Sequence, residues 1–182
     1  MLPIIASVIL IGCSDETIDP DISKPDATPQ AVIQNVNTGN ASGSFEAFSL
    51  DGSIYTEQLF TNSDITVVNI WGTFCGPCIE EMPYLGELAN KYHNIQLVGI
   101  VCDVYEGDSD GIEYAKYIVD ATGANYIHLL SNSDINAWKL NEIEYVPTTL
   151  IIDNNGNILY ETVGSRSLKE WEDLISQYIV LE

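Results

Sequence analysis

The chain has 182 residues, of which 27 are acidic and 6 are basic, so its formal net charge is -21. This length suits one domain with a tail, because single domains usually span about 100 to 200 residues. Hydrophobic residues make up 46% of the chain, which argues against general disorder and against a core that depends on disulfides. The negative charge repels phosphate backbones, so we expect no nucleic-acid partner.

The first eleven residues are almost wholly apolar, but they are too few to cross a bilayer core, which takes about 20 residues. They lead into Leu10-Ile11-Gly12-Cys13, which resembles the lipobox of bacterial lipoproteins, where the cysteine carries the lipid. We therefore expect a signal peptide over residues 1–12 and lipidation of Cys13, although no Lys or Arg precedes that cysteine. The alternative is a short buried segment with an ordinary cysteine.

Residues 13–43 contain Asp, Pro, Thr, Asn, Gln and Gly with few large apolar side chains. Such a segment buries too little surface to offset the entropy of ordering it. We expect a flexible tether here, linking the lipid anchor to a globular domain over residues 44–182.

A parallel strand-helix-strand unit is predicted near the start of the domain. Before it, Phe45–Leu50 and Ile54–Leu59 flank the turn signal Asp51-Gly52 and predict a β-hairpin. Thr66–Trp71 is a β-branched run typical of a buried strand, and Ile95–Val101 is a second one. The residues after Cys78 have the apolar spacing of a helix, which completes the unit.

The rest of the chain predicts further alternation of helices and strands. Gly123, which ends a helical pattern, and the turn Asn154-Asn155-Gly156-Asn157 mark two of the boundaries. The predicted elements are a helix over Gly111–Thr122, a strand over Tyr126–Leu130, a helix over Asp134–Leu140, strands over Thr148–Asp153 and Ile158–Val163, and a helix over Leu168–Ile179.

A Cys-x-x-Cys pair, Cys75 and Cys78, follows the first predicted strand and begins the first helix. A helix N-terminus offers unpaired N–H groups and partial positive charge, which stabilise the thiolate of the first cysteine. That thiolate can attack a disulfide, and the second cysteine can then resolve the mixed disulfide. Two alternatives are half of a zinc site and a merely structural disulfide, but a second Cys-x-x-Cys is absent from the sequence and so short a ring restrains little chain entropy.

Residues 69–83, Asn-Ile-Trp-Gly-Thr-Phe-Cys-Gly-Pro-Cys-Ile-Glu-Glu-Met-Pro, resemble the active-site segment of TlpA/ResA-type thioredoxin-like proteins, which are membrane-tethered thiol-disulfide oxidoreductases. Val146-Pro147-Thr148-Thr149 is similar to the cis-proline loop of that family. The resemblance implies an α/β thioredoxin fold: a central mixed sheet flanked by helices, with an N-terminal β-hairpin and an inserted helix and strand after the first strand-helix-strand unit.

Roles for individual residues follow from the same resemblance. Cys75 is the expected nucleophile and Cys78 the resolving thiol, while Glu81 would accept the proton of the resolving thiol. The expected substrate surface comprises Trp71, Gly76, Pro77, Val146 and Pro147, with Pro147 in the cis form. The alternatives are that Trp71 is a core residue, that Glu81 is an ordinary solvated residue, and that Pro147 is a trans strand-edge proline.

Two further residues stand out beside these motifs. Phe74 replaces the tryptophan that often precedes the cysteine pair in thioredoxin relatives. Cys102 follows the second buried strand and is expected at the active-site edge of the sheet. We interpret it as a buried, inert thiol, with a regulatory redox role as the alternative.

The sequence therefore predicts an enzyme that reduces disulfides in proteins outside the cytoplasm, held at a bacterial membrane by its lipid. Expected partners are disulfide-containing proteins such as an apocytochrome c or a methionine sulfoxide reductase, together with a membrane protein that supplies electrons. We expect no bound cofactor or metal. The alternatives are a peroxiredoxin-like thiol peroxidase, suggested by Thr73-x-Cys75, and a copper-delivery module with His128 as its candidate ligand.

Overall fold

The computed structural model describes residues 43–179. The predicted signal peptide, Cys13 and all of the predicted tether except residue 43 lie outside the described residues, so these assignments stay predictions. Among the described residues, no helix is long and apolar enough to cross a bilayer.

A five-stranded mixed sheet in the order β5-β4-β3-β6-β7 forms the centre of the fold. Strands β3 (Ile65–Trp71), β4 (Ile95–Tyr105) and β5 (Ile127–Ser131) are parallel. Strands β6 (Thr148–Asp153) and β7 (Ile158–Val163) run antiparallel to their neighbours. Every residue of the central strand β3 is buried, which accounts for its β-branched sequence.

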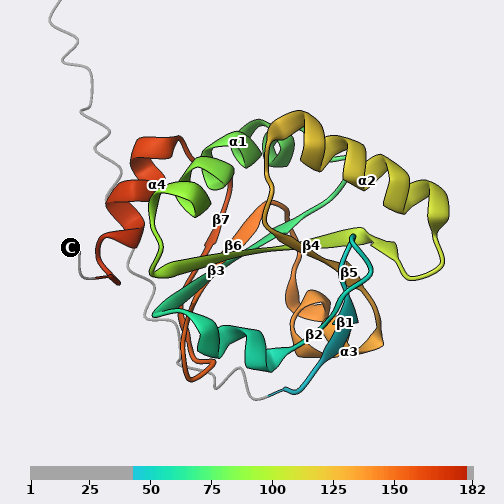
Figure 1. Cartoon of the computed structure of the whole chain (residues 1–182), viewed down its shortest axis with the longest axis horizontal. Coiled ribbons are helices and arrows are strands. Elements are labelled where there is room, and N and C mark those ends of the chain that lie inside the picture. Colours follow the sequence, from blue (N-terminus) through green and yellow to red (C-terminus); the bar gives the residue numbers. More distant parts are fainter. Residues whose placement is uncertain (1–42, 180–182) are drawn as a thin grey trace, which may run out of the picture. The chain divides into compact units, whose positions relative to one another are not determined.

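Helices cover both faces of this sheet (Figure 1). Helices α1 (Gly76–Lys91), α2 (Ser109–Thr122) and α4 (Leu168–Ile175) lie on one face. The short helix α3 (Ser133–Trp138) and a 3-10 helix, η1 (Glu57–Asn62), lie on the other. Successive side chains of β3 alternate between the hydrophobic cores on the two faces of the sheet. The predicted central mixed sheet flanked by helices is therefore confirmed.

The predicted N-terminal hairpin is present, with β1 (Glu46–Phe48) paired to β2 (Ile54–Thr56). It is fixed to β5 by a hydrogen bond of 2.8 Å from the Leu50 N–H to the His128 carbonyl. The expectation of strand as far as Leu59 is wrong, because η1 begins at Glu57. The Thr56 hydroxyl caps η1, and its consecutive side chains Leu59 and Phe60 are both buried, an arrangement that a strand with alternating faces does not give.

Two other predicted boundaries are also corrected. Strand β4 continues past Val101 to Tyr105, with an irregular pairing register to β5 between those residues. Helix α3 ends at Trp138 because Lys139 leaves the helical conformation, and a 3-10 turn, η2 (Leu140–Glu142), follows. The predicted inserted helix and strand are α2 and β5. As expected, α2 is ended by Gly123, which adopts a left-handed conformation with a φ of 69°.

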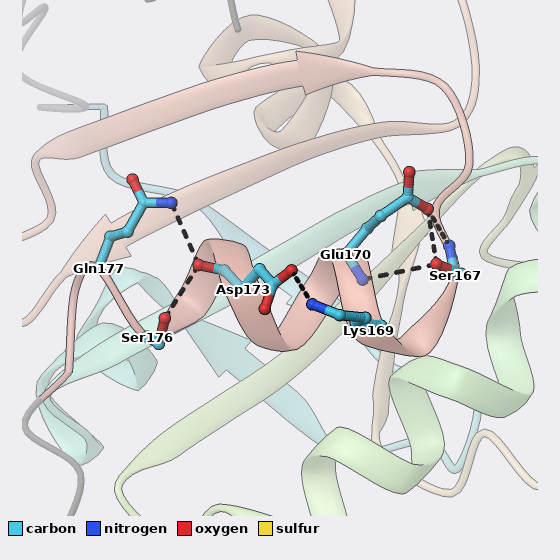
Figure 2. A network of polar contacts seen from close by, with 6 residues as sticks. All are labelled: Ser167, Lys169, Glu170, Asp173, Ser176 and Gln177. Atoms are coloured by element: carbon cyan, nitrogen blue, oxygen red, sulfur yellow. Dashed lines mark hydrogen bonds and ion pairs between the residues drawn. The ribbon is translucent and has the colours of Figure 1, made fainter. Parts of the chain in front are cut away.

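Side-chain hydrogen bonds fix both ends of α4 (Figure 2). At the start, Ser167 and Glu170 form a capping box in which each side chain bonds the other residue's backbone N–H. At the end, the side chains of Ser176 and Gln177 both donate to the Asp173 carbonyl. This carbonyl is therefore taken by side chains, and α4 ends at Ile175 instead of the predicted Ile179.

Candidate active site

The two cysteines lie where β3 passes into α1 and are joined by a disulfide of 2.05 Å. Cys75 is the N-cap of α1, and the Cys78 N–H donates to the Cys75 sulfur at 3.2 Å. Cys75 exposes 6% of its surface, whereas Cys78 is fully buried. The sulfur nearer the surface is therefore the one held by the helix N-terminus, the position in which a thiolate is stabilised.

The loop before β6 lies directly against Cys75. The Val146–Pro147 peptide bond is cis, as predicted, so the alternative of a trans strand-edge proline is wrong. The Cys75 sulfur is 3.7 Å from the Val146 carbonyl oxygen, a separation at which a reduced thiol can donate to that oxygen. Pro147 in turn accepts a hydrogen bond of 2.8 Å from the Gly164 N–H, which attaches this loop to the end of β7.

Glu81 is buried, with 1% of its surface exposed, so it is not an ordinary solvated residue. It lies on the same helix as Cys78, and both side chains belong to the buried face of α1. Its carboxylate accepts hydrogen bonds from the Asn69 side chain at 3.0 Å and from the Arg166 backbone N–H at 3.1 Å. Burial raises the pKa of Glu81 to about 7, although these donors oppose the shift.

Asn69 and Arg166 are residues of this site that the sequence reasoning missed. Asn69 had a visible signal, since it is an amide in an otherwise apolar and β-branched strand that leads into the cysteine pair. Arg166 had none, because only the folded chain brings the loop between β7 and α4 to Glu81. The Arg166 guanidinium donates to the Gly164 carbonyl and lies over the ring of Trp171. These two contacts hold the loop in place.

Trp71, predicted at the substrate surface, is fully buried. Its indole N–H donates to Nδ1 of His128 at 3.2 Å, and the two rings meet edge to face. Any influence of Trp71 on a partner is therefore exerted through the residues that it packs against. Gly76 and Pro77, in contrast, are exposed in the first turn of α1 next to Cys75.

A groove of about 530 Å³ lies beside the cysteine pair. Its lining includes the exposed aromatic rings of Phe74 and Tyr145, and it continues to Val146. Cys102 also lines this groove, so its expected place at the active-site edge of the sheet is confirmed, although it is half-buried instead of buried. Burial, reinforced by the charge of Asp103, raises the pKa of the Cys102 thiol to about 11, which fits an inert thiol.

The two alternative functions are not favoured by this geometry. Both ring nitrogens of the buried His128 are engaged, one with Trp71 and the other with the Ala124 carbonyl at 2.8 Å, so it is not free to bind copper. Within residues 43–179, no cluster of three potential metal-ligating side chains occurs. The Thr73 hydroxyl, which a peroxidase would direct at its substrate, donates instead to Asp103.

Known thiol-disulfide exchange proteins are similar to this chain over most of its length. A thiol:disulfide interchange protein DsbE from Vibrio cholerae is 24% identical over 177 residues, covering 96% of this chain and 90% of the relative. A thiol-disulfide oxidoreductase ResA from Bacillus thuringiensis is 23% identical over 144 residues, covering 79% of this chain and 80% of the relative.

Solved structures give the same result for the fold. A thioredoxin family protein from Chlorobium tepidum superposes with a TM-score of 0.63 at 20% identity, covering 75% of this chain and 93% of the other. The predicted thioredoxin fold, the TlpA/ResA-type resemblance and the class of enzyme, a thiol-disulfide oxidoreductase, are thereby confirmed. The Redoxin family model matches residues 25–175, and the chain belongs to the Redoxin family.

Proposed function

We propose that this protein reduces disulfide bonds in partner proteins outside the cytoplasm, by dithiol exchange through Cys75 and Cys78. The observation that carries the proposal is the position of the Cys75 sulfur, which lies between the Cys78 N–H in the first turn of α1 and the Val146 carbonyl. A thiolate there is stabilised by the helix and adjoins backbone that can pair with an extended partner strand.

The exchange has two steps. The Cys75 thiolate attacks a partner disulfide, so that a bond to one partner sulfur forms while the partner's own S–S bond breaks. Cys78 then loses its proton and attacks the Cys75 sulfur, which releases the second partner sulfur as a thiolate that takes up a proton. The partner has gained two electrons, and the protein is left as the Cys75–Cys78 disulfide.

Glu81 is the proposed acceptor of the Cys78 proton. A buried carboxylate with a pKa of about 7 exchanges a proton near neutral pH, as a general base should. Its place on the buried face of α1, together with Cys78, supports this role. Replacing it by glutamine should slow the resolving step on the order of 100-fold while leaving the first attack intact.

The sequence and the surface around Cys75 support the proposed direction of transfer and the proposed class of partner. The dipeptide between the two cysteines, Gly76-Pro77, is the one found at this place in reducing thioredoxins, and this favours a reductant. The groove lined by Phe74 and Tyr145 provides apolar area on which the segment flanking a partner cysteine would lie. The proposed partners, taken from the resemblance to TlpA/ResA-type proteins, are an apocytochrome c or a methionine sulfoxide reductase.

The proposed location is the outer side of a bacterial cell membrane, with the lipid on Cys13 as the anchor and residues 13–43 as the tether. Support comes from the lipobox-like sequence and from the low apolar content of that segment. Such a reductant must be reduced again after each turnover. Its proposed electron donor is a membrane protein that passes electrons outward across the membrane. A Cys13→Ala variant should lose membrane attachment in cell fractionation, and retention at the membrane would contradict lipidation.

The experiment that tests the function is a redox titration of the purified protein in glutathione buffers, with the free thiols trapped at each potential. A reductant should have a potential near that of thioredoxin, about -270 mV, whereas a value near -120 mV would identify an oxidant. Insulin reduction is measured in parallel. It should be lost in Cys75→Ser and retained in Cys102→Ser, because Cys102 lines the groove but supplies no sulfur to the exchange.

A further inference from the structure

A carboxylate on the neighbouring strand holds the loop that carries Cys75. This loop, Gly72–Cys75, leaves the end of β3, and its own turn is closed by the Cys75 N–H donating to the Gly72 carbonyl at 3.0 Å. Asp103 of β4 accepts the Thr73 backbone N–H at 3.0 and 3.2 Å through its two oxygens. It also accepts the Thr73 hydroxyl at 2.5 Å. One side chain thus fixes the residue two positions before the nucleophile.

The backbone of β4 is shaped to deliver this carboxylate. Pairing of β3 with β4 ends at Trp71 and Val101, and the pairing of β4 with β5 is irregular between Val101 and Tyr105. Asp103 lies inside that irregular stretch, at the end of the sheet from which the active-site loop emerges. Irregularities of this kind re-aim side chains near active sites. Here the result is that Asp103 meets Thr73, a residue 30 positions away in the chain.

The carboxylate has no competing ionic partner in the part of the chain that the structure describes, where the ion pairs all involve Lys91, Lys139 or Lys169. Its interactions with Thr73 are charge-assisted hydrogen bonds, which are stronger than neutral ones. The held loop bears Phe74, with 72% of its surface exposed, directly before Cys75. The position of Cys75, the nucleophile, therefore depends on this attachment, and so does the position of the Phe74 ring in the groove.

We infer that Asp103 is a positioning residue for the proposed thiol-disulfide exchange: by holding Thr73, it keeps the Cys75 sulfur in place between the α1 N-terminus and the Val146 carbonyl. This inference rests on the proposed function. It assigns Asp103 no contact with the reacting sulfurs. Asp103 affects the rate at which Cys75 attacks, because a nucleophile displaced by even about 1 Å loses much of its reactivity toward a bound partner.

The test is the rate constant for reduction of a peptide disulfide by the reduced protein, measured where every variant is folded. Asp103→Ala should slow the reaction about tenfold or more. Asp103→Asn should recover most of the rate, since its amide oxygen still accepts from Thr73. Thr73→Ala should have a smaller effect, because it removes only the hydroxyl bond to Asp103 and keeps the backbone N–H bonds, and it should add little to Asp103→Ala in the double variant.

The matched control is Asp153→Ala. Asp153 is a loop-holding carboxylate at the other end of the sheet, where it accepts from the backbone of Asn155 and Asn157 and from the Asn157 side chain. This variant should lower stability but leave the rate constant unchanged. An Asp103→Ala rate within about twofold of wild type, or no recovery in Asp103→Asn, overturns the positioning role. Full activity in Cys75→Ser would instead overturn the proposed function itself, so the two failures are distinguishable.

Discussion

The indole of Trp71 and the imidazole of His128 are joined by a hydrogen bond of 3.2 Å inside the core. Because Trp71 can only donate, Nδ1 of His128 must accept, and its Nε2–H donates to the Ala124 carbonyl. The ring is thus held neutral in one tautomer, next to the strand end that leads into Cys75. Burial lowers the pKa of His128 to about 4.

Acid stability should depend on His128. Its pKa is lower in the folded state than in the unfolded state, so its contribution is complete above about pH 6.5 and is lost as pH falls toward 4. The loss should amount to about 3 kcal/mol in the free energy of unfolding. Urea unfolding at pH 7 and pH 4.5 measures it in wild type and His128→Gln. The variant should lack this dependence, whereas the exposed-site control His93→Gln should keep it; equal slopes in wild type and His128→Gln would contradict the assignment.

Glu81 should act at the other end of the pH range. Its pKa is higher in the folded state, so its contribution is complete below about pH 4.5 and is lost as pH rises through 7. Wild type should therefore lose about 3 kcal/mol of stability relative to Glu81→Gln between pH 4.5 and pH 8. Urea denaturation across this range checks the difference, with the exposed Glu80→Gln as control. A constant difference between wild type and Glu81→Gln would show that Glu81 titrates normally.

The groove beside Cys75 should determine how well partners bind. Removing an exposed ring in Phe74→Ser or Tyr145→Ser should raise the KM for a peptide disulfide about threefold or more, with little change for a small disulfide such as oxidised glutathione. Tyr117→Ser is the matched control, since Tyr117 is an equally exposed ring on α2. If Phe74→Ser and Tyr145→Ser kept the wild-type KM for the peptide disulfide, the groove would be excluded as a docking surface.

The capping box of α4 should contribute to stability without affecting exchange. Ser167→Ala removes the hydroxyl that caps the helix and should lower the free energy of unfolding by about 1 kcal/mol. Removing the exposed ion pair in Lys169→Ala should give no measurable change (Figure 2). Thermal unfolding and insulin reduction distinguish the two effects, and a loss of activity in Ser167→Ala at a temperature where it is folded would contradict this view.

The sequence predicted the fold and the cysteine site well, because both depend on local patterns. The β-branched strand before Cys75 is contained within a few residues, so it follows from the sequence pattern itself. The cis form of Pro147 is expected from the resemblance of its motif to the TlpA/ResA-type loop. Other features depend on contacts between distant segments. The burial of Glu81, which accepts from the Arg166 N–H, and the attachment of Thr73 to Asp103 come from tertiary packing. The end of α4 at Ile175 comes instead from local side-chain capping, which periodicity does not encode.

The most direct test of dithiol exchange is capture of the mixed disulfide. A Cys78→Ser variant cannot resolve the intermediate, so the reduced variant mixed with a disulfide-containing protein should accumulate a covalent complex. Mass spectrometry after acid quenching should place the bond on Cys75, and Cys75→Ser should form none. A complex joined through Cys102, or no complex with Cys78→Ser, would contradict Cys75 as the nucleophile.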